Sequence, residues 1–294
     1  MAAVLPTQAR GKVRHMLSRR ILLAFGVGAP MLSIAAQARP FPKPAWPSGA
    51  DAAGIVDRFP VPEGFKRLNV ADDGFGAWLR QLPLRPPGEP VRFHDGRIKP
   101  DQSGAAAVID IDVGRGDLQQ CADAIIRLRA EYLRAVRPGA DLAFRFTSGD
   151  RFAYADWLAG RRPVVRGNKV AWESVGATSD TYAGFRRWLD VIFTYAGTMS
   201  LQRELRPVRD AGGVEPGDVL IQPGTPGHAV VVIDVAVGIS GERRALLAQS
   251  FMPAQSIHVL NNPAGGTWYR LAGERRIVTP EWTFAPGDLR RFPA

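Results

Sequence analysis

The chain has 294 residues, of which 46% are hydrophobic, 9% are aromatic and one is a cysteine. The hydrophobic content excludes an intrinsically disordered chain, and the single cysteine excludes a disulfide framework and any cysteine-rich zinc or iron–sulfur site. Half of the formal net charge of +10 belongs to the first 38 residues, which carry five basic residues and no acidic one. The other basic residues are scattered rather than gathered in a stripe, which argues against nucleic-acid binding.

The N-terminal segment has the features of an export signal. Arg19-Arg20 precede an uncharged, largely apolar run over residues 21–38, and this run ends in the small-residue pattern Ala36-Gln37-Ala38 that a signal peptidase can cut. The run is short for a membrane span, which needs about 20 apolar residues. We therefore expect residues 1–38 to be a signal peptide, with Met16 as an alternative start. The mature protein is expected in the periplasm or cell envelope, without a stable membrane span.

The rest of the chain predicts a linker and one domain. Residues 39–58 are rich in proline and are expected to form a linker, followed by a single domain over 59–294. Hydrophobic periodicity predicts strands over 105–113, 142–146, 219–222, 228–236, 245–249 and 256–260, and helices over 117–133 and 182–195. Helices dominate the first half and strands the second, so we expect an α+β fold with helices packed on a mainly antiparallel sheet.

The only cysteine lies where a helix is expected to begin. Asp117 is predicted to cap that helix, with Gln120 at the capping-box position. Cys121 then falls in the first turn, where unpaired N–H groups and the helix dipole favour a thiolate. His228 begins a long predicted strand rich in β-branched residues, directly after Gly227, which leaves room around an imidazole. A helix-start thiol facing a histidine on a sheet is the arrangement of papain-like hydrolases.

The strands around this histidine resemble a known hairpin. Residues 217–231 contain Gly-Asp before one strand and Gly-His-Ala-Val-Val at the start of the next. This pattern resembles the His-bearing hairpin of papain-like cell-wall amidases of the NlpC and CHAP types. The resemblance implies a papain-like, NlpC-like fold with Cys121 as nucleophile, His228 as base and Gln249, on the following strand, as the group that orients the ring.

The same resemblance suggests the residues that bind substrate. A glutamine just ahead of the cysteine, Gln119 or Gln120, would donate a hydrogen bond to the oxyanion, as a glutamine upstream of the cysteine does in papain. We take Gln120 as the expected donor, with Gly227 and Ser250 as the other expected substrate-binding residues.

Over nearly its whole exported part, the chain also resembles a bacterial family described as domain of unknown function 4846. The matching stretches are 117–133, 193–205, 217–236 and 246–260. The family description implies no activity. The papain-like hairpin therefore carries the functional prediction, which is a cysteine amidase or peptidase that acts on a cell-envelope polymer or peptide such as peptidoglycan peptide.

Two other interpretations stay open. Cys121 shares an apolar helical stripe with Leu118 and Leu128, as a buried core residue would. In that case the chain is a catalytically inactive envelope binding module on the same fold, and its many aromatic residues could include a carbohydrate-stacking platform. Asp110 and Asp112 share one face of a predicted strand, and paired carboxylates are typical of glycosidases and divalent-metal sites. Because no Walker loop, GxGxxG motif or zinc-binding histidine spacing is present, no cofactor or metal is expected.

Overall fold

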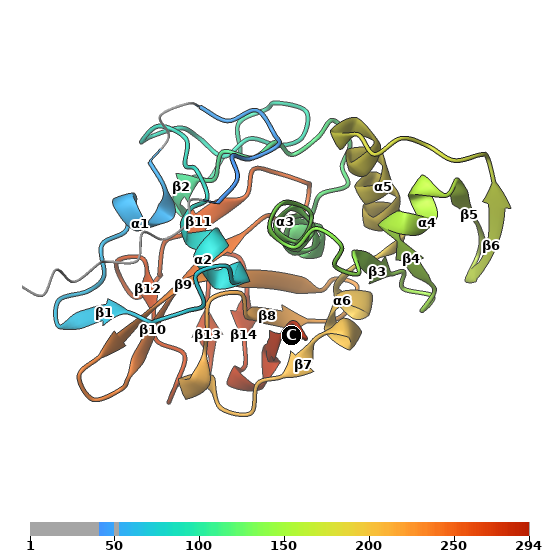
Figure 1. Cartoon of the computed structure of the whole chain (residues 1–294). Coiled ribbons are helices and arrows are strands. Elements are labelled where there is room, and N and C mark those ends of the chain that lie inside the picture. The colour runs from blue at the N-terminus through green and yellow to red at the C-terminus, as the bar shows by residue number, and fades with distance from the viewer. Residues whose placement is uncertain (1–40, 50–52, 294) are drawn as a thin grey trace, which may run out of the picture. The chain divides into compact units, whose positions relative to one another are not determined.

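The computed structural model describes residues 41–49 and 53–293 (Figure 1). The predicted signal peptide lies outside these residues. The elements are α1 (Ile55–Arg58), β1 (Phe65–Arg67), α2 (Phe75–Arg80), β2 (Ala105–Val108), α3 (Cys121–Val136), β3 (Ala143–Arg145), β4 (Arg151–Ala153), α4 (Tyr154–Leu158), β5 (Arg161–Arg166), β6 (Lys169–Ser174), α5 (Tyr182–Tyr195), α6 (Thr198–Glu204), β7 (Arg206–Pro207), β8 (Val219–Gln222), β9 (His228–Gly238), β10 (Arg243–Gln249), β11 (His258–Leu260), β12 (Trp268–Tyr269), β13 (Ile277–Val278), β14 (Thr283–Phe284) and β15 (Leu289–Arg291). Within these two described ranges, no helix is long and apolar enough to cross a membrane.

An antiparallel sheet forms the centre of the fold. Its strand order is β2-β11-β10-β9-β8-β15-β7, with β1 paired to the far end of β9 and β12 paired to β10. Strand β9 reads HAVVVIDVAVG, and its β-branched residues favour the extended backbone of a strand. Nine of its eleven residues are buried, so this strand is covered on both faces. The predicted α+β class, with helices on a mainly antiparallel sheet, is confirmed.

The two faces of β9 contribute to different hydrophobic cores. Ala229 and Val231 belong to the same core as apolar residues of α2, α3 and α5. Helices α2 and α3 contact β9 on one face of the sheet, and α5 packs against α3 (Figure 1). Val230 and Val232 pack instead with apolar residues of the C-terminal strands β12 to β15. Successive side chains of a strand point to opposite faces. Over residues 229–233, the position of a residue on β9 therefore decides which of the two hydrophobic cores its side chain enters; beyond the irregularity in the pairing with β10, Val235 lies in the same core as Val232.

The predicted elements agree with the structure except near their ends. Helix α5 and strand β8 have the predicted bounds, 182–195 and 219–222. The strand predicted over 105–113 ends at Val108, because beyond it Asp110 turns its N–H to the carbonyl oxygen of Pro83 rather than to the neighbouring strand.

Helix α3 begins four residues later than predicted. The Asp117 carboxylate accepts a hydrogen bond from the N–H of Ala254, at 2.6 Å, instead of capping the helix. Gln120 occupies the N-cap position, and its N–H donates to the carboxylate of Asp123 at 3.2 Å. Cys121 is consequently the first residue of the helix, in the first turn as predicted.

The described part of the predicted linker packs on the domain. Trp46 is only 4% exposed, and its indole N–H donates to the carbonyl oxygen of Asp110 at 2.7 Å. Ile55 is fully buried in the same core as α2 and α3. The proline content signals an extended backbone, but Trp46 and Ile55 give this segment apolar surface that is stabilised by burial.

A buried arginine joins the helices to the loop that precedes Cys121. The guanidinium of Arg127 is fully buried and donates to Glu131 at 2.7 Å, to the side chain of Gln119 at 3.0 Å and to the hydroxyl of Tyr182 at 2.9 Å. It also pairs with Asp112 at 3.1 Å. Because these partners come from α3, α5 and the loop before α3, Arg127 holds the start of α3 in place.

Replacing this arginine should strongly destabilise the domain. Arg127→Met leaves the buried carboxylate of Glu131 without its cation, which costs about 3–5 kcal/mol. We expect a lower urea midpoint with an unchanged slope. The double variant Arg127→Met/Glu131→Leu, which removes both charges, should recover part of this loss. A single variant as stable as the parent would contradict the structural role.

Candidate functional site

Cys121 is a buried residue at the start of α3. Its Sγ lies 3.9 Å from the carbonyl oxygen of Gly227, and the residue is 5% exposed. Burial, together with the nearby carboxylate of Asp123, raises the pKa of the Cys121 thiol to about 11. These two effects outweigh the stabilisation of a thiolate by the helix N-terminus. At neutral pH the side chain is therefore an unreactive thiol.

His228 is equally buried and is held by Gln249. One oxygen of Glu281 accepts from the amide nitrogen of Gln249 at 2.6 Å, so the amide oxygen faces His228 Nε2 at 2.8 Å. This orientation requires a proton on Nε2, because an amide oxygen only accepts. Among the described residues, His228 Nδ1 has no hydrogen-bond partner. Burial lowers the pKa of the ring to about 4.

Cys121 and His228 lie on opposite faces of β9. The imidazole contacts Phe251, Trp282 and Phe284, with ring centroids 4.9, 5.4 and 5.9 Å away. Phe284 belongs to the core under the C-terminal strands, whereas the helix that begins at Cys121 packs on the other core. No hydrogen bond joins the thiol to the imidazole in the part of the chain that the structure describes. The structure thus brings His228 and Gln249 together, but not Cys121 and His228.

The predicted substrate-binding residues make internal contacts. Gln120 donates from its amide nitrogen to Asp117 at 3.0 Å. The hydroxyl of Ser250, which has one proton to donate, lies within hydrogen-bonding distance of the carbonyl oxygens of Gln119, at 3.1 Å, and Gln255, at 2.8 Å. The contact between Ser250 and Gln119 links the loop before α3 to the end of β10.

Gly227 allows a close approach between two loops. A Cβ atom at this position would lie 2.5 Å from the hydroxyl oxygen of Thr198 and 2.8 Å from the carbonyl oxygen of Gln222. The sequence predicts that this glycine leaves room around the imidazole of His228. The structure shows that it leaves room for the start of α6.

The carboxylate pair of Asp110 and Asp112 is held by arginines. Asp110 accepts from Arg85 at 3.2 Å, and Asp112 pairs with Arg127 at 3.1 Å and Arg186 at 2.9 Å. Within residues 41–49 and 53–293, no group of three or more His, Cys, Asp or Glu side chains could hold a metal ion. The two carboxylates therefore act as separate ion-pair partners in this structure.

A row of polar side chains connects His228 to the surface. Gln249 links the imidazole to Glu281, and Glu281 forms an ion pair with Lys99. His258 lies opposite Gln249 on the neighbouring strand and donates from Nδ1 to the carbonyl oxygen of Ser256 at 2.9 Å. Burial lowers the pKa of His258 to about 4 as well. This polar row, on the face away from Cys121, contains both buried histidines.

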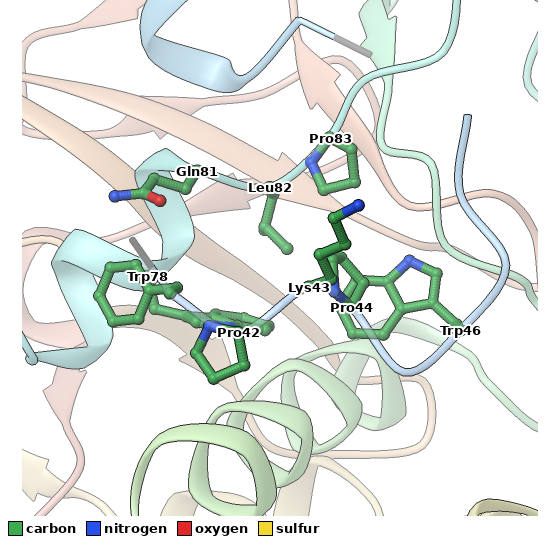
Figure 2. A pocket seen from close by; sticks show the side chains of 9 residues that line it. Pro42, Lys43, Pro44, Trp46, Trp78, Gln81, Leu82 and Pro83 are labelled. Carbon is green, nitrogen blue, oxygen red and sulfur yellow. The ribbon is translucent and has the colours of Figure 1, made fainter. Parts of the chain in front are cut away.

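Two surface cavities lie away from both predicted catalytic residues. The first has a volume of about 180 Å³ and lies between the segment 41–46 and the end of α2 (Figure 2). Its lining is Phe41, Pro42, Lys43, Pro44, Trp46, Trp78, Gln81, Leu82 and Pro83. The second has a volume of about 280 Å³, and its lining is Asp141, Ala143, Phe144, Arg145, Arg151 and Glu204.

The fold and these residues define an α+β domain in which a cysteine-initiated helix packs on an antiparallel sheet whose central strand begins with histidine. The chain belongs to the family described as "Domain of unknown function (4846)", whose match covers residues 55–291. This match confirms the family resemblance stated from the sequence. Neither the curated proteins nor the solved structures give a match, so the NlpC- and CHAP-type resemblance stays a prediction.

Several residues of these sites were not predicted from the sequence. Glu281 and Lys99 lie far from His228 along the chain, and no local pattern links them. Arg145 and Glu204 likewise come from separate elements. Trp46 did carry a signal, because a tryptophan in a proline-rich segment indicates an aromatic side chain that packs against a folded domain.

The buried histidines should make the domain sensitive to acid. Their pKa values are about 4 in the folded protein and about 6.5 in an unfolded chain. The unfolded state therefore binds more protons between these values, so the stabilisation is complete above pH 6.5 and is lost as the pH falls towards 4. The loss amounts to about 3 kcal/mol for each histidine.

Urea unfolding of the purified protein at pH 7, 6, 5 and 4.5 measures this effect. His258→Gln should flatten the profile, whereas His94→Gln, which changes a histidine outside the polar row, should leave its slope unchanged. Glu204 has the opposite effect on the free energy of unfolding. Burial raises its pKa to about 7, so the folded state binds this proton more tightly than the unfolded state and Glu204 stabilises the fold more as the pH falls. If the free energy of unfolding of His258→Gln changed with pH as steeply as that of the parent, His258 would not be buried as described.

Proposed function

We propose that this protein is a catalytically inactive binding module of the cell envelope, built on a papain-like, NlpC-type fold and exported by the signal in residues 1–38. Its ligand is a segment of an envelope polymer of the peptidoglycan type. The binding site is the cavity beside Trp46 and Trp78. The observation that carries the proposal is this surface cavity with aromatic residues in its lining, which contains neither of the predicted catalytic residues.

The fold assignment rests on one local arrangement. The start of α3 packs on the first residues of β9, so a cysteine at a helix N-terminus and a histidine at a strand start occupy neighbouring elements. The NlpC-type resemblance implies the same two positions. A binding module on this fold keeps the helix that begins with cysteine and the strand that begins with histidine, but does not use their side chains for catalysis.

The states of Cys121 and His228 favour binding over hydrolysis. A cysteine hydrolase needs a thiolate within hydrogen-bonding reach of its base. Here burial holds the thiol pKa near 11 and the imidazole pKa near 4, so both groups are neutral over the intervening range. The strand between them keeps them on opposite faces.

The cavity has the composition of a small recognition site. Trp46 and Trp78 meet edge to face, with ring centroids 6.2 Å apart, and the lining adds prolines and one leucine. Lys43 and Gln81 supply polar groups at its exposed rim. Ligand pockets generally combine an apolar lining with a few polar groups and span about 300–1,000 Å³. Because this cavity is smaller, it suits one ring or one side chain of a longer polymer.

The reactivity of Cys121 decides between a binding module and a hydrolase. We expect iodoacetamide to leave Cys121 unmodified in the native protein at every pH from 5 to 9, and to modify it rapidly after unfolding in urea. Mass spectrometry of the intact chain reads the outcome, with Cys121→Ala as the unreactive control. A rate that is already high at low pH would show a thiolate and would favour the papain-like amidase or peptidase.

Ligand binding tests the cavity directly. Isothermal titration with soluble muropeptides should give binding, and Lys43→Ala or Gln81→Ala should weaken it about fivefold, which corresponds to one hydrogen bond. Lys66→Ala, which removes an exposed lysine of β1, is the matched control. Separate titrations with the glycan and with the stem peptide identify the part that enters. An absence of binding, or equal weakening by Lys66→Ala, would refute the assignment of this cavity.

A further inference from the structure

The second cavity places two arginines directly opposite each other. Strands β3 and β4 pair with Arg145 across from Arg151, and both side chains line the cavity. Like charges that face each other across a strand pair are destabilising. The inward neighbours Phe144 and Phe152 are buried and fix the register of this hairpin. The hairpin therefore places the two arginine side chains on the same, outer face, where both line the cavity.

The acidic groups at this cavity neutralise the arginines only in part. Arg151 forms an ion pair with Asp141. Arg145 donates to the carbonyl oxygen of Gly149 at 2.9 Å, and among the described residues no carboxylate lies within ion-pair distance of it. Its positive charge is therefore available to an anion.

Glu204, the last residue of α6, also lines the cavity. One of its carboxyl oxygens accepts the backbone N–H of Arg145 at 2.5 Å, which occupies a donor at the edge of β3. Burial raises the pKa of Glu204 to about 7, although that N–H and the two arginines oppose the rise. The other nearby cation of α6, Arg203, points away and donates to the carbonyl oxygen of Thr147 at 3.2 Å.

We propose that the cavity between the β3–β4 hairpin and the end of α6 is a binding site for a small monocarboxylate, anchored by Arg145 and Arg151. Guanidinium groups bind carboxylates through paired N–H donors, which suits this anion. With Glu204 protonated, the two arginines and Asp141 leave a charge of one positive unit at the cavity, which a singly charged carboxylate balances. A phosphate dianion would leave an excess negative charge. The volume of about 280 Å³ accommodates a ligand of amino-acid size.

The proposal predicts tighter binding at lower pH. An ionised Glu204 adds a negative charge to the cavity lining and repels the carboxylate of the ligand, and its pKa near 7 leaves it mostly protonated at pH 6 and mostly ionised at pH 8. If only the protonated form binds, the affinity falls about tenfold between these two pH values. This site is separate from the cavity beside Trp46, so its failure would leave the proposed function untouched.

Titration of the full chain with N-acetylalanine tests the site. We expect binding at pH 6, about tenfold weaker binding at pH 8, and no binding of N-acetylalaninamide, which lacks the charge. Arg151→Gln should weaken binding about tenfold, whereas Arg166→Gln, which changes an exposed arginine of β5, should not. Glu204→Gln keeps an acceptor for the Arg145 N–H and should make the affinity independent of pH.

Three results would overturn the proposal. The first is an absence of binding at pH 6, which needs no variant. The second is equal binding of the acid and its amide, because the site is defined by charge. The third is a pH dependence that survives in Glu204→Gln, because no other group at this cavity would then account for it. Inorganic phosphate as a second probe should bind more weakly than N-acetylalanine, and tighter binding of phosphate would also contradict the monocarboxylate assignment.

Discussion

The alternation of side chains along β9 is the constraint on which the rest of the structure depends. This strand is covered on both faces, and its consecutive valines enter two different cores. Helices α2 and α3 pack on one face and the C-terminal strands on the other, so a shift of one residue would exchange the two sets. Such a shift would place His228 under α3 and drive Ala229 into the opposite core. The pairing of Gln222 with His228 and of Val219 with Val231 fixes the register in which His228 faces away from α3.

This register explains why a thiol and an imidazole that are close in the fold do not form a catalytic pair. Cys121 approaches the backbone of β9 at Gly227, one residue before the histidine, yet the side chain of His228 leaves from the other side of the strand. Burial therefore shifts the pKa of the thiol and of the imidazole, and neither group stabilises a charge on the other. It raises the pKa of the acid and lowers the pKa of the base, so desolvation favours the uncharged form of both. A catalytic dyad requires the opposite, a charge on each group that is stabilised by its partner.

The sequence predicted several individual elements but not the contacts around His228, for one physical reason. Periodicity identifies helix 182–195 and strand 219–222 with the observed bounds, because each carries its own apolar pattern. The run from Ala229 to Ile233 is apolar at every position, so it contains no signal for which face the helices cover. The face of β9 from which the His228 side chain projects therefore cannot be predicted from this run of residues. The partners Glu281 and Lys99 depend on contacts between distant segments, which no local pattern records.

The residues that the sequence suggested as catalytic or metal-binding groups make structural contacts in this domain. One of them, Asp110, helps to form the cavity that we propose as the binding site. Asp110 was a candidate for a carboxylate pair. Its backbone oxygen accepts the indole N–H of Trp46, and its carboxylate accepts the N–H of Gly49 at 2.7 Å. These two bonds hold the segment 41–49 against the end of α2, and without them one wall of the cavity would be lost. The groups that remain available to a ligand, such as Lys43 and Arg145, belong to no motif. In this domain, recognition is therefore expected from surfaces that tertiary contacts assemble, because the motif residues are buried or paired with other residues of the chain.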